Sequence, residues 1–147
     1  MATSDNVLRA GLTPKHRDVD NLLASLTWTF GATHAVTPHA LSSGSGSETS
    51  KSKSKYSMVY DPPAPEFAVV RAALPPGGET EAHGAFTGPS ILIVTHGVGT
   101  LSASAPGENN VVLQLQEGCV VFVAAGVEVT FASGPADRLV LYRAYYP

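Results

Sequence analysis

Cysteine is almost missing from this sequence, because Cys119 is the only one among 147 residues. A single thiol excludes an internal disulfide framework and a zinc cage built from several cysteines. The apolar neighbours of Cys119 predict that its side chain is buried. Charge is also scarce: Asp, Glu, Lys and Arg make up 14% of the residues, and the formal net charge is −3. This balance provides no basic surface for DNA or RNA, so we expect no nucleic-acid partner.

Long apolar runs are missing as well. The longest, CVVFVAAGV, is far too short to cross a bilayer, and the first residues show no basic segment followed by an apolar one. We therefore expect a soluble cytoplasmic protein without a membrane partner. Apolar residues still make up 44% of the chain, which predicts a packed globular body.

The first predicted part of the chain is residues 1–34, a short strand and loop followed by one amphipathic helix. Its apolar side chains recur at the spacing of one helix face: Val19, Leu22, Leu23 and Leu26. The pair Phe30-Gly31 is expected to end the helix. A helix this short needs a partner for its apolar face, so we expect this exposed surface to promote association.

The second predicted part, residues 35–57, is rich in Ser, Gly and Lys. No apolar residue stands between Ser42 and Lys55. Without apolar side chains to bury, such a segment cannot offset the entropy of ordering its backbone. We expect a flexible linker here.

The third predicted part, residues 58–147, is a β-barrel. Short runs rich in Val, Ile, Leu, Phe and Tyr alternate with Gly- and Pro-containing turns, a pattern typical of a sandwich or barrel. In VEVTF, the side chains of Val127, Val129 and Phe131 are expected to share one face. No segment after the linker has a helical apolar period, so the fold class is mainly β.

The spacing of the turn glycines in this barrel resembles that of the two cupin motifs. The cupin fold is a small jelly-roll barrel. The first motif has a glycine, five residues, His-x-His, a glutamate and, six residues later, another glycine. The second has a glycine, five residues, Pro-x-Gly and then a histidine. The matching glycines here are Gly77, Gly97, Gly118 and Gly126.

The metal-binding positions of the two cupin motifs are mostly vacated. Only His83 stands where the motif has a ligand, and the other positions hold Ala85, Ser90 and Val129. A divalent ion needs three or four converging donors, which these residues do not supply, so we expect a metal-free barrel. His83 is then expected at the surface or rim, and the nearby Glu79 and Glu81 are expected to be solvated.

The opening of the chain carries a longer motif. MATSDNVLRAGLTPK resembles the signature segment of type I mannose-6-phosphate isomerases, which reads close to Met-Ala-x-Ser-Asp-Asn-x-x-Arg-Ala-Gly-x-Thr-Pro-Lys. The stretch YDPPAPEFAVVRA, residues 60–72, resembles the segment that enters the C-terminal cupin barrel of that family. The similarity covers nearly the whole chain apart from the Ser/Lys-rich linker.

The resemblance implies a reaction and a place in a larger enzyme. The family interconverts mannose 6-phosphate and fructose 6-phosphate with a bound zinc, a step that supplies GDP-mannose. It implies that Arg9 is a catalytic residue and that Lys15 attracts the substrate phosphate. The zinc ligands of the family lie upstream of this motif. The chain is thus expected to be a C-terminal segment that alone binds no zinc and is inactive.

Other functions remain open from the sequence. Arg9 and Lys15 could form ordinary surface ion pairs. The barrel could be a non-catalytic cupin module that binds a sugar phosphate or a partner protein. A metal-dependent cupin oxygenase or germin-like protein is disfavoured by Ala85, Ser90 and Val129 at the ligand positions.

Overall fold

The computed structural model describes residues 8–27, 35–43, 52–63, 65–104, 107 and 110–147. The chain divides into two compact units, Met1–Ala35 and Val36–Pro147. Within the described ranges no helix has the length and apolar character needed to cross a membrane.

The first unit contains the helix α1, Val19–Ser25. Asp18 caps its N-terminus, since the Asp18 carboxylate accepts a hydrogen bond from the Asn21 backbone N–H over 3.2 Å. The predicted helix is confirmed, but it ends earlier than predicted, because Leu26 has extended backbone angles. Its apolar face is largely unburied: Val19, Leu23 and Leu26 are 45%, 56% and 45% exposed. Phe30-Gly31 lies outside the described residues.

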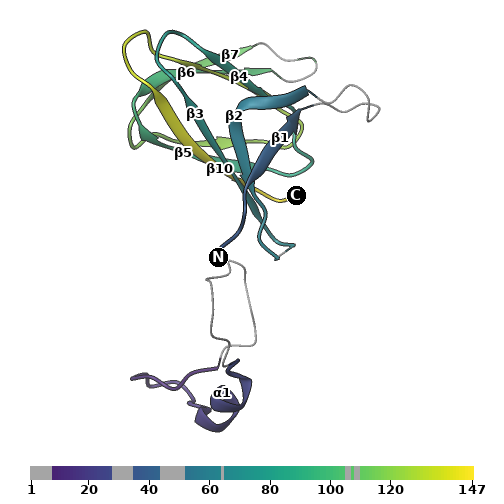
Figure 1. Ribbon diagram of the computed structural model, residues 1–147, viewed down its shortest axis with the longest axis vertical. Coiled ribbons are helices and arrows are strands. Elements are labelled where there is room, and N and C mark those ends of the chain that lie inside the picture. The colour runs from purple at the N-terminus through teal and green to yellow at the C-terminus, as the bar shows by residue number, and fades with distance from the viewer. Residues whose placement is uncertain (1–7, 28–34, 44–51, 64, 105–106, 108–109) are drawn as a thin grey trace. The chain divides into compact units, whose positions relative to one another are not determined.

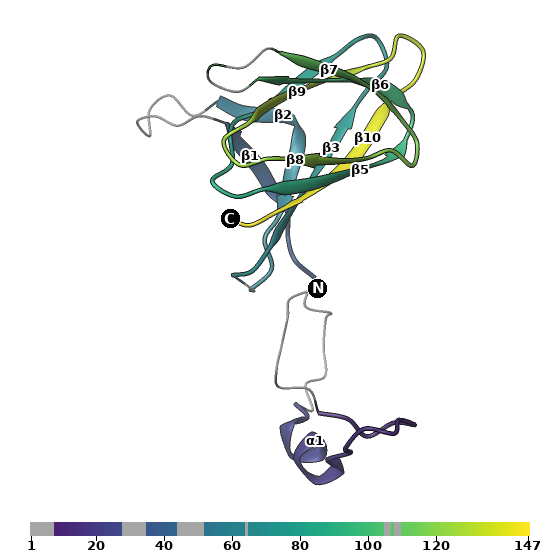
Figure 2. The same ribbon diagram turned by 180° about the vertical axis from the view of Figure 1, so that it is seen from behind.

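The described residues of the second unit form ten strands, whose arrangement is shown in Figures 1 and 2. They are β1 (His39–Ser43), β2 (Ser52–Tyr60), β3 (Ala68–Leu74), β4 (Thr80–His83), β5 (Ser90–His96), β6 (Val98–Ser104), β7 (Val111–Gln116), β8 (Val120–Val123), β9 (Glu128–Ser133) and β10 (Leu139–Tyr145). A six-stranded sheet has the order β1-β2-β3-β10-β5-β8, and a four-stranded sheet has the order β4-β9-β6-β7. All the strand pairs are antiparallel. The mainly-β prediction is confirmed.

Alternation along the strands determines which side chains enter the barrel. In β3 every second residue is buried, from Ala68 to Leu74, and in β9 Val129 and Phe131 are buried while their neighbours Glu128 and Thr130 are exposed. The shared face predicted for VEVTF is therefore confirmed. Each fully buried Val, Leu or Phe contributes roughly 1.5–3 kcal/mol relative to an exposed one.

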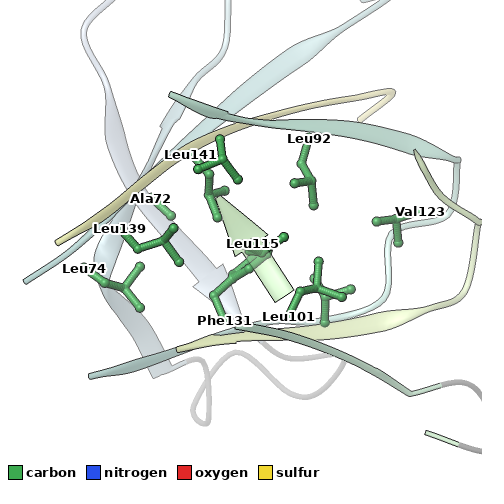
Figure 3. Close-up of a cluster of buried hydrophobic side chains, with 11 residues drawn as sticks. Ala72, Leu74, Leu92, Leu101, Leu115, Val123, Phe131, Leu139 and Leu141 are labelled. Atoms are coloured by element: carbon green, nitrogen blue, oxygen red, sulfur yellow. The ribbon is translucent and has the colours of Figure 1, made fainter. Parts of the chain in front are cut away.

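Eleven buried residues form the main apolar cluster between the two sheets. Figure 3 shows Leu92 and Leu141 of the six-stranded sheet pointing toward Phe131 of the four-stranded one. A second, smaller cluster consists of four buried residues: Leu41, Val59, Ala68 and Val70. Phe86 and Tyr145 pack against it.

The predicted linker overlaps two strands and needs correction. β1 and the first residues of β2 lie within 35–57, and the two strands pair, with His39 opposite Val59 and Ala40 opposite Met58. Backbone hydrogen bonds between strands do not require apolar side chains, so a polar stretch can still form a sheet edge. The barrel therefore starts earlier than predicted, while residues 44–51, the centre of the predicted linker, lie outside the described residues.

The four motif glycines all have positive φ angles, between 77° and 112°. Gly97 is the most constrained of them, at φ 83° between β5 and β6. A Cβ at this position would overlap the carbonyl oxygen of Arg138, which belongs to the turn before β10. Only glycine satisfies both the angle and the close approach.

Candidate functional site

Arg9 and Lys15 lie on one loop that precedes α1. The Asp18 backbone N–H donates to the Arg9 carbonyl over 2.9 Å and so brings the two ends of the loop together. Within the loop, the Lys15 N–H donates to the Thr13 hydroxyl over 3.2 Å. The side chain of Lys15 is exposed and Arg9 is half-buried. Neither side chain forms a hydrogen bond or ion pair with another described residue.

Asp18 fixes the junction of this loop with the helix. Its carboxylate accepts from the Asn21 side chain over 2.6 Å as well as from the Asn21 backbone. The side-chain hydrogen bond is the main cause that lowers the pKa of Asp18, so the cap stays ionised at neutral pH. A capped helix and a closed loop hold the backbone that carries Arg9 and Lys15.

The barrel contains a second group of polar residues that we call the polar layer: Ser57, His83, Ser90 and Arg143. All four are nearly inaccessible to solvent. On β10, Arg143 stands between Leu141 of the main cluster and Tyr145, which packs against the smaller cluster. The polar layer therefore lies inside the barrel, flanked by apolar residues.

His83 was expected at the surface or rim, and this expectation is wrong. Its side chain is 1% exposed because His83 alternates with exposed Ala82 along β4 and faces inward. The Nε2 atom lies 2.9 Å from the Ser57 hydroxyl, and the ring packs edge-on against Phe131. Burial, aided by the charge of Arg143, lowers the pKa of His83 to about 3, so the imidazole is neutral at pH 7.

Arg143 is the charged residue of the polar layer, and sequence reasoning missed it. Its side chain is 0% exposed, its Nε donates to the Ser90 hydroxyl over 2.9 Å, and its guanidinium carbon lies 4.1 Å from the centre of the Phe86 ring. Burial lowers the pKa of Arg143 to about 10, so the group is still a cation at pH 7. A signal was present: Leu139, Leu141 and Arg143 alternate along one strand, which places them on one face.

Glu79 and Glu81 were expected to be solvated, but Glu79 forms side-chain contacts and Glu81 is buried. Glu79 accepts a hydrogen bond from the Tyr56 hydroxyl over 2.8 Å and lies 3.7 Å from the Lys55 ammonium. Glu81 is only 6% exposed, because it shares the inward face of β4 with His83. Cys119, expected to be buried, is half-buried and packs against the main cluster.

The described residues do not fit a zinc site. They contain no group of three His, Cys, Asp or Glu side chains placed to hold a metal ion. Of the cupin ligand positions, His83 already bonds to Ser57, Ser90 bonds to the cationic Arg143, and Val129 pairs with His83 across β4 and β9. Ala85 has no donor side chain, so the donor chemistry needed for Zn²⁺ is missing from the polar layer.

A cavity of about 340 Å³ lies beside the polar layer. His83 and Phe86 line it, together with Leu41, Glu128 and Thr130. Phe86 belongs to the loop between β4 and β5, and its carbonyl accepts from the Gly126 N–H over 2.9 Å. Its ring contacts the guanidinium of Arg143 and stacks on Tyr145 with a centroid distance of 4.1 Å.

Comparison with known proteins finds similarity to one family along both units. Residues 57–106 match the family model of the phosphomannose isomerase type I C-terminal domain. The chain is 36% identical to mannose-6-phosphate isomerase of Schizosaccharomyces pombe over 149 residues, and 38% identical to that of Cryptococcus neoformans over 145. The chain resembles the C-terminal part of mannose-6-phosphate isomerases. Each alignment covers 99% of this chain, but only 32% and 30% of the two relatives, so the chain spans about a third of their length.

The barrel has relatives among solved structures. Hydroxypropylphosphonic acid epoxidase from S. wedmorenis superposes with a TM-score of 0.52 at 17% identity, covering 63% of this chain and 51% of the epoxidase. At this identity the likeness concerns the fold alone. It confirms the cupin-like barrel that the glycine spacing predicted.

Proposed function

We propose that this chain is the C-terminal part of a mannose-6-phosphate isomerase, which interconverts mannose 6-phosphate and fructose 6-phosphate. The observation that carries the proposal is the near-complete coverage of this chain by proteins of that name, which extends beyond the barrel to the segment of Arg9 and Lys15. We place the enzyme in the cytoplasm, where its product would supply GDP-mannose synthesis.

The proposed role of Arg9 follows from the chemistry of the reaction. Aldose–ketose isomerisation moves a proton between adjacent carbons and develops negative charge on the sugar oxygens. A guanidinium stays protonated and offers several donors in a fixed plane, which suits an oxygen that becomes more negative in the transition state. The hydrogen bond between Arg9 and Asp18 holds the backbone from which this side chain extends.

Lys15 is proposed to attract the phosphate of the substrate. A lysine ammonium is a compact point charge on a flexible stem, and it acts on phosphate without a fixed geometry. The exposed position of Lys15 on the same loop as Arg9 is compatible with this role.

The family is expected to use zinc, which polarises the sugar oxygens when it is bound. Since the described residues do not fit a zinc site, we propose that its ligands belong to the part of the enzyme that the relatives have beyond the matched third. This chain then contributes charge and structural support, and we expect no turnover from it alone.

A chimera tests the proposal. The region of the S. pombe enzyme that matches this chain is replaced by residues 1–147, and a coupled assay measures isomerisation of mannose 6-phosphate with added zinc and with chelator. We expect chelator-sensitive turnover from the chimera and none from the 147-residue chain.

The same assay separates the alternative function. A folded but inactive chimera, beside an active parent enzyme, would contradict the proposal. If the chain alone then bound mannose 6-phosphate without metal, the alternative of a non-catalytic cupin module would be supported instead. Circular dichroism of the chimera distinguishes loss of function from loss of fold.

A further inference from the structure

The guanidinium of Arg143 is buried with much of its hydrogen-bonding capacity unused. Its Nε bonds to Ser90, but Nη1 and Nη2 have no hydrogen-bond partner among the described residues. No carboxylate in the described part of the chain forms an ion pair with it. A cation buried without a partner costs several kcal/mol, so such a group is rarely retained for stability alone.

The side chains that contact this cation are neutral or aromatic. His83 is uncharged at pH 7, and its Nδ1 atom also has no partner among the described residues. The face of Phe86 covers the guanidinium. Glu81 shares the inward face of β4 but forms no ion pair with Arg143. The Oε1 atom of Glu81 is itself buried without a hydrogen-bond partner among the described residues. The described residues therefore provide no anionic partner within ion-pair distance of the Arg143 guanidinium.

Phe86 contacts the guanidinium and also lines the neighbouring cavity. The cavity of about 340 Å³ is lined by Phe86 and His83 but not by Arg143 itself. The ring of Phe86 lies on a loop segment, Gly84–Pro89, that contains two glycines and connects β4 to β5. Because Arg143 contacts this ring but does not line the cavity, its Nη atoms can meet a molecule in the cavity only if the ring moves.

We propose that the cavity binds a small monocarboxylate, whose two oxygens accept hydrogen bonds from Nη1 and Nη2 of Arg143 after the Phe86 ring turns aside. The planar fork of a guanidinium matches the two oxygens of a carboxylate. One carboxylate would give the unpaired guanidinium an anionic partner. A phosphate dianion would bring an excess negative charge, which Glu128 at the cavity wall also opposes. This site is independent of the proposed isomerase function, since it uses neither Arg9 nor Lys15.

Thermal unfolding of the 147-residue chain tests the site, with sodium acetate and sodium propionate as probes and sodium chloride at equal ionic strength as the reference. A ligand that binds only the folded state raises its stability with concentration. We expect a saturable rise of the melting temperature with either carboxylate, beyond that of chloride, and at least a tenfold smaller response to sodium phosphate at equal concentration. An equal response to phosphate would overturn the assignment to a monocarboxylate.

Two variants locate the site. Arg143→Lys keeps the charge but loses the fork, so we expect acetate to bind at least tenfold more weakly. Phe86→Ala removes the cover, so we expect binding to tighten severalfold. Saturation-transfer NMR on the acetate methyl group compares acetate binding to the parent chain and to the two variants without unfolding the protein. An unchanged acetate signal in folded Arg143→Lys, or no difference between acetate and chloride in the parent chain, would overturn the proposal.

Discussion

The Nε atom of Arg143 lies 2.9 Å from the hydroxyl of Ser90, at the position where the cupin motif places a metal-binding glutamate. A guanidinium thus bonds to the residue that replaces a metal ligand. The positive charge inside this barrel is the guanidinium of Arg143.

Removing the Ser90 hydroxyl tests how strongly the structure depends on this bond. Ser90→Ala leaves the buried Nε without an acceptor, so we expect the free energy of unfolding to fall by about 1–3 kcal/mol. Urea denaturation measures the change. Ser102→Ala, at an exposed position on β6, is the control and should change stability by no more than about 0.5 kcal/mol. Equal denaturation midpoints for the two variants would show that Ser90 does not support Arg143.

His83 makes the stability of the barrel dependent on pH. Its folded pKa of about 3 lies below the ordinary 6.5, so the unfolded chain binds more protons between these values. The contribution of neutral His83 to the free energy of unfolding is therefore fully present above pH 6.5. It is lost progressively as the pH falls from 6.5 toward 3. The loss from this group amounts to about 2 kcal/mol at pH 5.

The variant His83→Gln isolates this effect. Glutamine keeps an amide near the Ser57 hydroxyl but does not titrate, so the decrease of stability between pH 7 and pH 5 should become about 2 kcal/mol smaller. His39→Gln, at an exposed site on β1, is the matched control and should keep the parent pH dependence. If His83→Gln unfolded with the parent pH dependence, the neutral state of His83 would be wrong.

Gly97 and Gly78 separate backbone strain from steric overlap. Both have positive φ angles, 83° and 76°, but only a Cβ at position 97 meets another backbone segment, at Arg138. We expect Gly78→Ala to cost about 1–2 kcal/mol, from the left-handed conformation alone. Gly97→Ala should cost about 3–5 kcal/mol, because the turn must also move. Similar melting temperatures for the two variants would contradict the close approach.

Lys15 should affect substrate binding more than the chemical step. In the active chimera, Lys15→Ala is expected to raise KM for mannose 6-phosphate severalfold with little change in kcat, because charge attraction acts alike on substrate and transition state. The effect should shrink at high salt, which screens exposed charges. Arg17→Ala, another exposed cation near the same loop, serves as the control. A lower kcat at unchanged KM would assign Lys15 a different role.

The barrel was predictable because its strands alternate and its turns carry glycine. Both signals are local, so they can be recognised in a single sequence. The strands β1 and β2 were missed because their pairing depends on backbone hydrogen bonds, while no apolar side chain stands between Ser42 and Lys55. Composition alone therefore suggested a linker.

The polar layer was less predictable than the fold. The motif spacing singles out His83, but its burial depends on which face of β4 points inward, and the motif spacing does not fix that face. Arg143 was visible as an inward position of β10. However, an arginine is rarely fully buried, so composition argued against it. Its contacts with Ser90 and Phe86 join residues more than fifty positions apart, which no local pattern reveals.

Arg9 offers the most direct test of the central claim, that this chain contributes a catalytic arginine to a mannose-6-phosphate isomerase. The measurement is kcat of the chimera with Arg9→Ala and Arg9→Lys, with the melting temperature recorded on the same samples. We predict that Arg9→Ala lowers kcat by about 100-fold or more while the melting temperature stays within a few degrees, and that Arg9→Lys restores part of the rate. A kcat near that of the parent, together with a collapsed melting temperature, would show that Arg9 is structural and would contradict the claim.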